Sequence, residues 1–141
     1  MKQDRTTLLL ERHQLRKTNF RVELLNLFVD NSLKALSNID IESELSDYDR
    51  VTLYRTLKTF EQKGLIHLAL DGSESTKYAL CSHGSCYDNH HEDNHAHFHC
   101  NNCGITVCID ELQAPNIINI PNGFSVSSTH LIVKGKCNKC N

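Results

Sequence analysis

The sequence predicts an α+β protein in which an N-terminal winged helix-turn-helix is followed by a small α/β domain. Apolar residues with helical spacing recur up to residue 64, and a two-stranded pattern around a polar turn follows them directly. Helices followed by such a hairpin are typical of a winged helix. The remaining residues contain several strand-like runs, so we expect one domain over residues 1–81 and a second over residues 82–141.

Four helices are expected in the first domain, over residues 3–15, 18–30, 37–46 and 47–64. Three of them follow a residue whose side-chain oxygen can accept a hydrogen bond from the first turn: Thr18, Ser37 or Asn38, and Asp49. The last segment carries Leu53, Leu57 and Phe60 on one side, and Gly64 ends it. It precedes the hairpin, as the recognition helix of a winged helix does.

The spacing of apolar residues changes after Gly64. Residues 65–70 and 76–80 flank the turn sequence DGSES and predict the two strands of the hairpin. Residues 81–94 are polar and rich in turn-forming residues, which predicts a linker or an extended loop. Farther along the chain we expect strands over 96–100, 105–109 and 124–135, with a short helix over 110–120.

The composition favours a cytoplasmic protein with no membrane partner. The longest apolar run near the start covers residues 8–10 and is flanked by Arg5 and Glu11. It is too short for a signal-peptide core or for a membrane span. The formal net charge is −2, so any contact with nucleic acid must come from a local surface, and most Lys and Arg residues precede residue 80.

Two CxxC pairs predict a structural zinc site. They consist of Cys100 and Cys103, which a glycine follows, and of Cys137 and Cys140. Each CxxC turn places two thiolates on one side of a metal ion, and two such turns complete a tetrahedral Zn²⁺ site. Four thiolates leave no open coordination position, so we expect this site to hold the fold. A redox pair is the alternative, but no thioredoxin-like βαβ pattern accompanies it.

A second cluster of metal-binding residues lies just before the first CxxC pair. Six of the nine histidines fall within residues 83–99, and His95 and His97 share one face of a predicted strand. His67 and Cys81 stand at the two ends of the predicted hairpin and are candidate partners. From spacing alone, the simpler interpretation is a buried strand histidine and a small apolar cysteine. Other candidate ligands are Cys86, Asp93, Cys108, Glu111 and His130.

The order of four motifs resembles one known family. These motifs are LRKTNFR at 15–21, VTLYRTLKTFEQKGLI at 51–66, HAHFHCNNCG at 95–104 and VKGKCNKC at 133–140. Together they resemble the ferric uptake regulator (Fur) superfamily over about residues 10–140. The resemblance implies a winged-helix DNA-binding domain and a C-terminal α/β dimerisation domain. It also implies a metal-responsive repressor that binds palindromic, double-stranded operator DNA as a homodimer.

The resemblance assigns roles to residues of the first domain. The tyrosine–arginine pair of the family's recognition helix matches Tyr54 and Arg55, which are expected to contact bases or phosphates. Arg16 lies two residues before Thr18, where the family has a basic residue that reaches the minor groove. These three residues are therefore the expected DNA contacts.

The resemblance also favours the zinc-responsive branch of the superfamily. The iron regulators usually read HHDHxxC or HHHHxxC, whereas Asn94 and Ala96 replace the outer ligands in this chain. The zinc branch has a His or Asp after the recognition helix and a Cys after the tyrosine of the hairpin. The implied regulatory site thus consists of His67, Cys81, His95 and His97, with Cys108 as the main substitute. Zinc is the expected metal, and the alternative is an Fe²⁺-, Mn²⁺- or peroxide-responsive regulator of the same superfamily.

Two functions outside this family fit less well. A zinc hydrolase or deaminase needs an open zinc position and a general base, yet both four-ligand sets are closed and no HxE…PCxxC pattern occurs. We therefore expect no enzymatic activity and no small-molecule substrate. A metal-storage or scaffold protein would leave the helix-turn-helix without a purpose.

Overall fold

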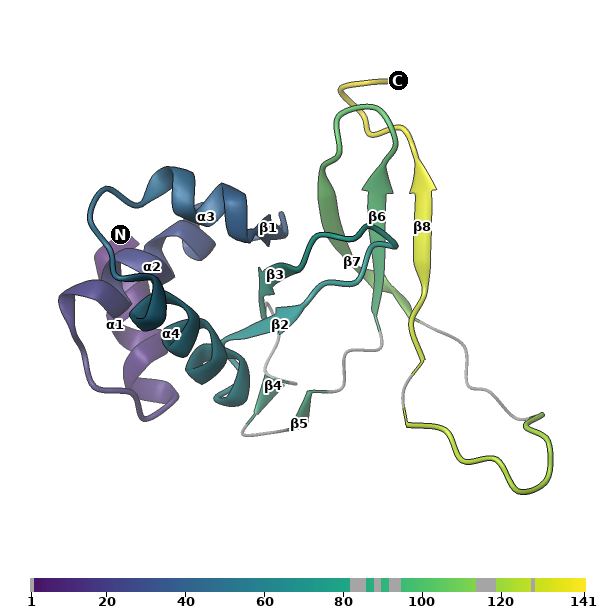
Figure 1. Ribbon diagram of the computed structural model, residues 1–141, viewed down its shortest axis with the longest axis horizontal. Coiled ribbons are helices and arrows are strands. Elements are labelled where there is room, and N and C mark those ends of the chain that lie inside the picture. Colours follow the sequence, from purple (N-terminus) through teal and green to yellow (C-terminus); the bar gives the residue numbers. More distant parts are fainter. Residues whose placement is uncertain (1, 82–85, 88–89, 92–94, 114–118, 128) are drawn as a thin grey trace.

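The computed structural model describes residues 2–81, 86–87, 90–91, 95–113, 119–127 and 129–141. Helices gather at one end of the molecule and a three-stranded sheet stands at the other, with a hairpin between them (Figure 1). The helices are α1 (Lys2–Arg12), α2 (Asn19–Asp30), α3 (Asn38–Glu44) and α4 (Arg50–Gln62). The strands are β1 (Leu36–Ser37), β2 (Ile66–Leu68), β3 (Lys77–Leu80), β4 (Cys86–Tyr87), β5 (His90–His91), β6 (His95–Cys100), β7 (Thr106–Gln113) and β8 (Ile132–Gly135).

Three of the helices begin at the predicted cap residues. Thr18 and Asp49 each accept a hydrogen bond from the backbone N–H three residues later, at the starts of α2 and α4. At α3, Ser37 rather than Asn38 is the cap, and it forms a reciprocal capping box with Asp40. The first helix ends at Arg12, short of the predicted residue 15, because the chain turns there with a positive φ at Gln14.

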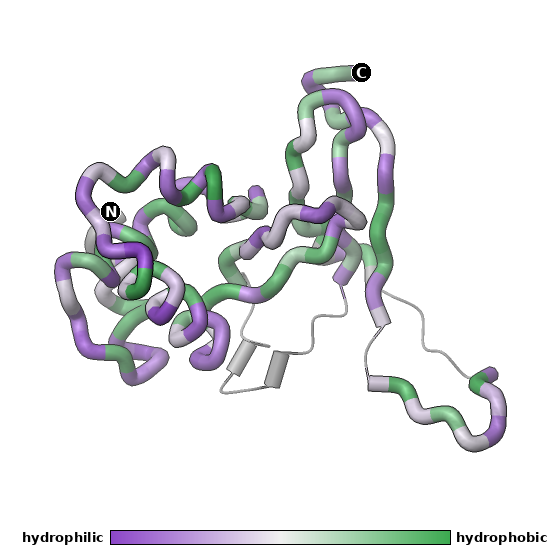
Figure 2. The backbone as a smooth tube through the Cα atoms, viewed as in Figure 1, coloured by the Kyte–Doolittle hydropathy of each residue, from purple (hydrophilic) through white to green (hydrophobic). Residues whose placement is uncertain are grey.

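The helices and the hairpin enclose one apolar core. Its buried members are Leu10, Leu15, Leu24, Leu25, Phe28, Leu36, Ile41, Leu45, Leu53, Leu57, Phe60, Leu65, Ile66 and Leu80. The helical region contains both hydrophobic and hydrophilic residues (Figure 2), and along α4 the buried residues recur every three to four positions, as in an amphipathic helix. The core fixes α4 through Leu53, Leu57 and Phe60, so the opposite side of that helix faces outward.

The hairpin forms as predicted and gains a strand that was not predicted. Strands β2 and β3 pair antiparallel around the turn DGSES, and the two-residue β1 pairs with the other edge of β3. The short β1 carries no alternating pattern of its own, because two residues are too few to show one. Helices α1–α4 with this small sheet make the winged helix-turn-helix, and the C-terminal sheet completes the α+β fold.

The C-terminal sheet has the strand order β7-β6-β8. Strand β6 pairs antiparallel with β7 and parallel with β8, and the β6–β7 register shifts between His95 and Ala96. The helix expected over 110–120 is wrong for residues 110–113, which continue β7 as far as Gln113. Pairing with β6 overrides the helical preference of that segment, while residues 114–118 lie outside the described part.

Two further expectations for the second half need correction. Of the strand expected over 124–135, the described residues form only β8, and residues 124–127 pair with no described strand. The segment expected to be a linker contains the short antiparallel pair β4–β5, with Cys86 opposite His91 and Tyr87 opposite His90. The rest of 82–94 lies outside the described residues. In the described part of the chain, no helix is both long and apolar enough to cross a membrane.

Candidate metal centres and nucleic-acid interface

The four predicted zinc cysteines lie together at one end of the C-terminal sheet. Strands β6 and β8 are parallel neighbours, with Cys100 opposite Gly135, so the two CxxC turns leave the sheet at the same end. The Sγ atoms of Cys100, Cys103, Cys137 and Cys140 lie within 4.8 Å of one another. The sulfurs of Cys103 and Cys137 are 3.7 Å apart. Zn–S bonds of about 2.3 Å at tetrahedral angles separate two sulfurs by about 3.8 Å, so the cluster fits zinc.

Cys100 is the most deeply buried of the four cysteines. Its side chain is fully buried, and the backbone N–H groups of Cys103 and Cys137 donate to its Sγ at 3.5 and 3.4 Å. These hydrogen bonds, that from Cys103 first, lower the pKa of the Cys100 thiol to about 5. The lowered pKa of Cys100 favours the thiolate, which is the form that binds a metal.

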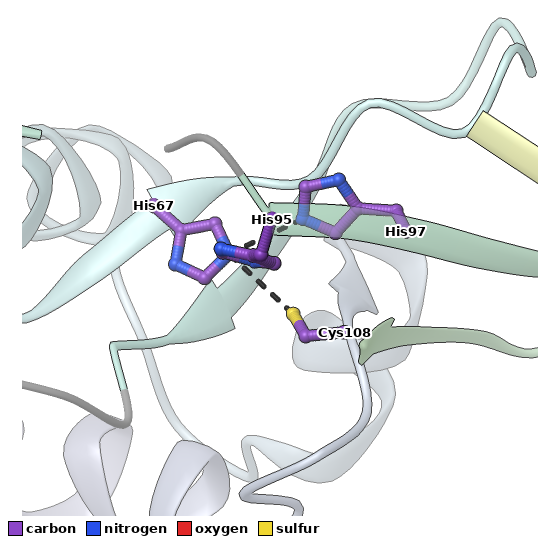
Figure 3. A group of neighbouring side chains, drawn as sticks. All are labelled: His67, His95, His97 and Cys108. Carbon is purple, nitrogen blue, oxygen red and sulfur yellow. Dashed lines mark hydrogen bonds between the residues drawn. The ribbon is translucent and has the colours of Figure 1, made fainter. Parts of the chain in front are cut away.

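A second cluster joins the hairpin to the C-terminal sheet. His67 comes from β2, His95 and His97 from β6, and Cys108 from β7, and one ligand atom of each lies within 4.8 Å of the others (Figure 3). The Nε2 atom of His67 is 3.4 Å from His97 Nε2 and 3.5 Å from Cys108 Sγ. Zn–N bonds of about 2.0–2.1 Å at tetrahedral angles separate two nitrogens by about 3.3–3.4 Å, so this donor set also fits zinc.

The strand geometry explains why these four residues meet. Residues i and i+2 of a strand share a face, so His95 and His97 both point from β6 toward the hairpin. The rings of His95 and His97 lie with their centroids 4.8 and 5.5 Å from that of His67. Cys108 stands opposite His97 in the β6–β7 ladder. The small side chains of Ala35, Ala69 and Ala79 pack beside Cys108, which lets β7 approach the hairpin closely.

Cys81 lies beside this cluster, on the other side of His67. Its Sγ is 3.5 Å from the Nδ1 atom of His67, whereas Nε2 is the nitrogen that faces His97 and Cys108. The structure thus brings three of the four predicted regulatory ligands together and places Cys108 with them. Nothing in the spacing around Cys108 identifies its role, because it enters the site through its position opposite His97.

The predicted DNA contacts lie on exposed surfaces of the winged helix. Tyr54 and Arg55 are on the outward side of α4, and Tyr54 is 44% exposed. The Tyr54 hydroxyl donates to Glu42 of α3 at 3.3 Å. Arg16 is exposed between α1 and α2, and its carbonyl oxygen accepts a hydrogen bond from Arg21 at 2.9 Å. Val51 is 55% exposed on α4 and adds an apolar group to this surface.

Comparison with protein-family models gives a match over most of this chain. The model of the ferric uptake regulator family matches residues 12–134. This chain belongs to the ferric uptake regulator family. Members of this family are metal-responsive transcription regulators, and the two clusters and the exposed helix α4 are the features that such a regulator needs.

Solved structures of Fur-family proteins share the fold. The ferric uptake regulator of Francisella tularensis with iron is 25% identical, with a TM-score of 0.56, and the alignment covers 89% of this chain and 94% of that one. A zinc uptake regulator complexed with zinc and DNA is 19% identical, with a TM-score of 0.62, and the alignment covers 97% and 91%. The Pseudomonas aeruginosa regulator with manganese is 18% identical, with a TM-score of 0.59 and coverage of 95% and 98%. Comparison with curated proteins gave no significant match.

The remaining candidate ligands of this Fur-family chain lie apart from both clusters or outside the described structure. Glu111 and His130 are exposed and belong to neither group of four. Asp93 lies outside the described residues, and Cys86 is described only as part of β4.

Proposed function

We propose that this Fur-family chain is a transcriptional repressor that binds palindromic operator DNA as a homodimer when a regulatory metal, zinc, is bound. The observation that carries the proposal is the cluster of His67, His95, His97 and Cys108, which spans the hairpin and the C-terminal sheet. A metal held by ligands from both parts favours one orientation of the winged helix. A symmetric dimer then presents two recognition helices at one fixed spacing, which a palindromic operator matches.

The donor set supports zinc over iron or manganese. Three imidazoles and one thiolate form a closed set of four borderline and soft ligands, which suits tetrahedral Zn²⁺. Fe²⁺ and Mn²⁺ sites in proteins commonly include a carboxylate ligand, and no carboxylate of the described residues belongs to this cluster. Sensing of Fe²⁺ or Mn²⁺ remains the second candidate, because solved relatives are described with iron and with manganese.

The geometry favours Cys108 as the thiolate ligand and gives Cys81 a supporting role. A neutral imidazole that binds a metal through Nε2 carries its proton on Nδ1. The His67 Nδ1–H would then donate to Cys81 Sγ, which fixes the orientation of the ring. The sequence-based set, with Cys81 as the ligand, is the alternative, and substitution of each cysteine distinguishes the two.

The cluster of Cys100, Cys103, Cys137 and Cys140 is proposed to hold a permanent Zn²⁺. Its four thiolates would tie the C-terminal end of the chain to the turn after β6, and the binding free energy would act as folding free energy. This site has no open position for a substrate, so we infer a regulator rather than an enzyme, with no small-molecule substrate.

The homodimer is proposed because the C-terminal part of the chain leaves apolar side chains exposed. Of the described apolar residues of this sheet, only Ala96 and Cys100 are fully buried, and in the segment before β8 Phe124 and Val126 are 72% and 50% exposed. Residues 124–127 alternate between apolar and polar side chains and project away from the rest of the chain (Figure 1). A second copy would give this segment a strand partner and cover its apolar face. We place the domain boundary after Cys81 and assign the protein to the cytoplasm, where its operator DNA lies.

The test is a DNA-binding titration at buffered metal concentrations. An operator is selected from a random-sequence duplex pool in the presence of zinc, and its affinity is measured with zinc, Fe²⁺ or Mn²⁺. We expect zinc to tighten binding by about tenfold or more, within the usual range of allosteric coupling. Equal affinity with and without each metal would show that the chain is not a metal-dependent repressor.

Three variants, measured in the same titration, test the roles of individual residues. Cys108→Ser should abolish the response to zinc, together with the sulfur-to-cobalt charge-transfer band of the Co²⁺-loaded regulatory site. Cys81→Ser should keep that band and weaken metal affinity by about 10–100-fold, as loss of an outer partner does. The reverse result would make Cys81 the ligand. Arg55→Ala is the control, because it should lose operator affinity while both metal sites remain loaded.

A further inference from the structure

A second contact joins the hairpin to the C-terminal sheet, at the opposite end of the hairpin from the histidine cluster. Asp71 begins the turn between β2 and β3, and it is only 2% exposed although its side chain is a carboxylate. Its Oδ2 atom accepts a hydrogen bond from the hydroxyl of Thr106, the first residue of β7, at 2.6 Å. A buried carboxylate without partners would be costly, so this residue needs the contacts that surround it.

The Asp71 carboxylate is fully surrounded by donors. Lys77 Nζ lies 2.6 Å from Oδ2, and its own side chain is 11% exposed. Ser73 donates to Oδ1 through its backbone N–H at 2.8 Å and through its hydroxyl at 2.5 Å. His99 Nδ1 lies 3.3 Å from Oδ2. The carboxylate therefore joins two residues of its own hairpin to two residues of the C-terminal sheet.

Lys77 adds further links across the same boundary. Its Nζ atom donates to Thr106 Oγ1 at 3.0 Å and to the carbonyl oxygen of Gly104 at 3.3 Å. Gly104 ends the first CxxCG turn, so the link reaches the loop of the four-cysteine cluster. The backbone of Thr106 also contacts the winged helix, because its carbonyl oxygen accepts a hydrogen bond from Ala35 N at 2.8 Å.

The turn that contains Asp71 also contains a glycine in a backbone conformation that other residues rarely adopt. Gly72 has a φ of +81°, which an L side chain rarely adopts, and a Cβ there would lie 2.9 Å from Lys134 Nζ of β8. The turn thus packs close to β8 as well as to β7. On β6, His99 follows His97 on the same strand face, so one face of one strand carries a ligand of the histidine cluster and a partner of Asp71.

We propose that Asp71 is a positioning residue, the centre of an interdomain clasp with Lys77, Thr106 and His99 that holds the hairpin in its DNA-binding orientation. The proposal rests on the function proposed above and adds a second determinant of domain closure beside the metal. The clasp and the regulatory metal hold the same hairpin against the same sheet, so each favours the state that the other requires.

This arrangement has a measurable consequence for metal sensing. The apparent affinity for the metal is proportional to the fraction of molecules that are closed before the metal binds. Loss of the clasp lowers that fraction, so more zinc is needed to reach the same operator affinity. Excess zinc restores closure, so operator affinity at saturating zinc should stay near that of the wild type.

The test compares two substitutions in one turn. Asp71→Asn removes a negative charge from the clasp, and Glu74→Gln removes one from an exposed residue of the same turn. Both substitutions remove one formal negative charge from the turn. In titrations of the dimer with buffered zinc, Asp71→Asn should shift the zinc midpoint for operator binding upward by about tenfold, with near-normal affinity at saturation. Glu74→Gln should leave the midpoint unchanged. An unshifted midpoint in Asp71→Asn would overturn the clasp.

A second pair of variants covers the case in which Asp71→Asn does not fold. Thr106→Val keeps the size of the buried side chain and loses the hydroxyl, whereas Thr106→Ser keeps the hydroxyl. Only Thr106→Val should shift the zinc midpoint, and an equal shift in both would contradict the proposal.

Hydrogen exchange separates failure of the clasp from failure of the repressor function. In the zinc-loaded protein without DNA, the amide of Ala35, which donates to Thr106, should exchange faster in Thr106→Val and in a folded Asp71→Asn. This readout holds even if no operator is found. Unchanged exchange in every folded clasp variant would reject the clasp whatever the protein does on DNA.

Discussion

His67 and Asp71 show how single residues of the hairpin reach the C-terminal sheet. His67 is 3% exposed and uses both ring nitrogens, one toward Cys81 and one toward His97 and Cys108. Asp71 is buried as deeply, four residues later. Burial alone would raise the pKa of its carboxyl, but the hydrogen bonds from Lys77 and its neighbours hold that pKa well below its ordinary value. His67 thus offers a nitrogen to the candidate metal site, whereas Asp71 places a buried negative charge at the contact with the sheet.

The lowered pKa of Asp71 predicts how stability depends on pH. Because the pKa is lower in the folded state, the contribution of Asp71 to stability is fully present above the ordinary carboxyl pKa of 3.8 and is lost as the pH falls toward the folded value. The free energy of unfolding of the wild type should therefore exceed that of Asp71→Asn at pH 6. The difference should shrink below about pH 4. Urea unfolding followed by circular dichroism at several pH values measures it, and a difference independent of pH would contradict the assignment.

At the scale of elements, helix α4 divides its residues between the core and the exposed surface that we propose contacts DNA. Leu53, Leu57 and Phe60 lie in the core, whereas Tyr54 and Arg55 face outward. The Asp49 cap fixes where the helix begins, through bonds of 3.0 and 2.9 Å to the backbone and hydroxyl of Thr52. The position of the helix and its contacts with DNA can therefore be changed separately.

Substitution of Phe60 should destabilise the winged helix without touching its DNA surface. Phe60 is fully buried, so Phe60→Ala should lower the free energy of unfolding by about 3–5 kcal/mol, through lost burial and the cavity that remains. Lys58→Ala on the exposed side of the same helix is the control and should change stability by less than about 0.5 kcal/mol. Urea denaturation curves give both values. Equal effects would mean that α4 does not pack as described.

At the scale of the whole molecule, the two parts of the chain are stabilised in different ways. The winged helix has its own apolar core, whereas the described part of the C-terminal sheet buries few large apolar side chains. A small sheet of this kind needs a metal or a partner to be stable. The four-cysteine cluster at its end would hold the metal, and the exposed Phe124 and Val126 are where we propose that a second copy packs.

Removal of the second CxxC pair should therefore unfold one part of the molecule. The double variant Cys137→Ser, Cys140→Ser should lose one zinc per chain in elemental analysis, and β6–β8 should lose protection from hydrogen exchange. The amides of α2 and α4 should stay protected, because their core contains no residue of the C-terminal sheet. A double variant that keeps its sheet protected and stays dimeric would contradict a structural role for this site.

The sequence by itself determined the features that are encoded locally. Helix spacing, caps and the hairpin turn predicted the winged helix, and two CxxC pairs predicted the four-cysteine cluster, because each signal lies within a few consecutive residues. Alternation along one strand likewise placed His95 and His97 on a common face.

Only the tertiary structure decided which distant residues complete these sites. Cys108 is 41 residues from His67 and meets it because β7 pairs with β6 in the register that places Cys108 opposite His97. Asp71 and Thr106 are 35 residues apart, and their contact depends on how the hairpin turn packs against β7. Such contacts follow from strand order and register, which the local pattern of polar and apolar residues does not encode.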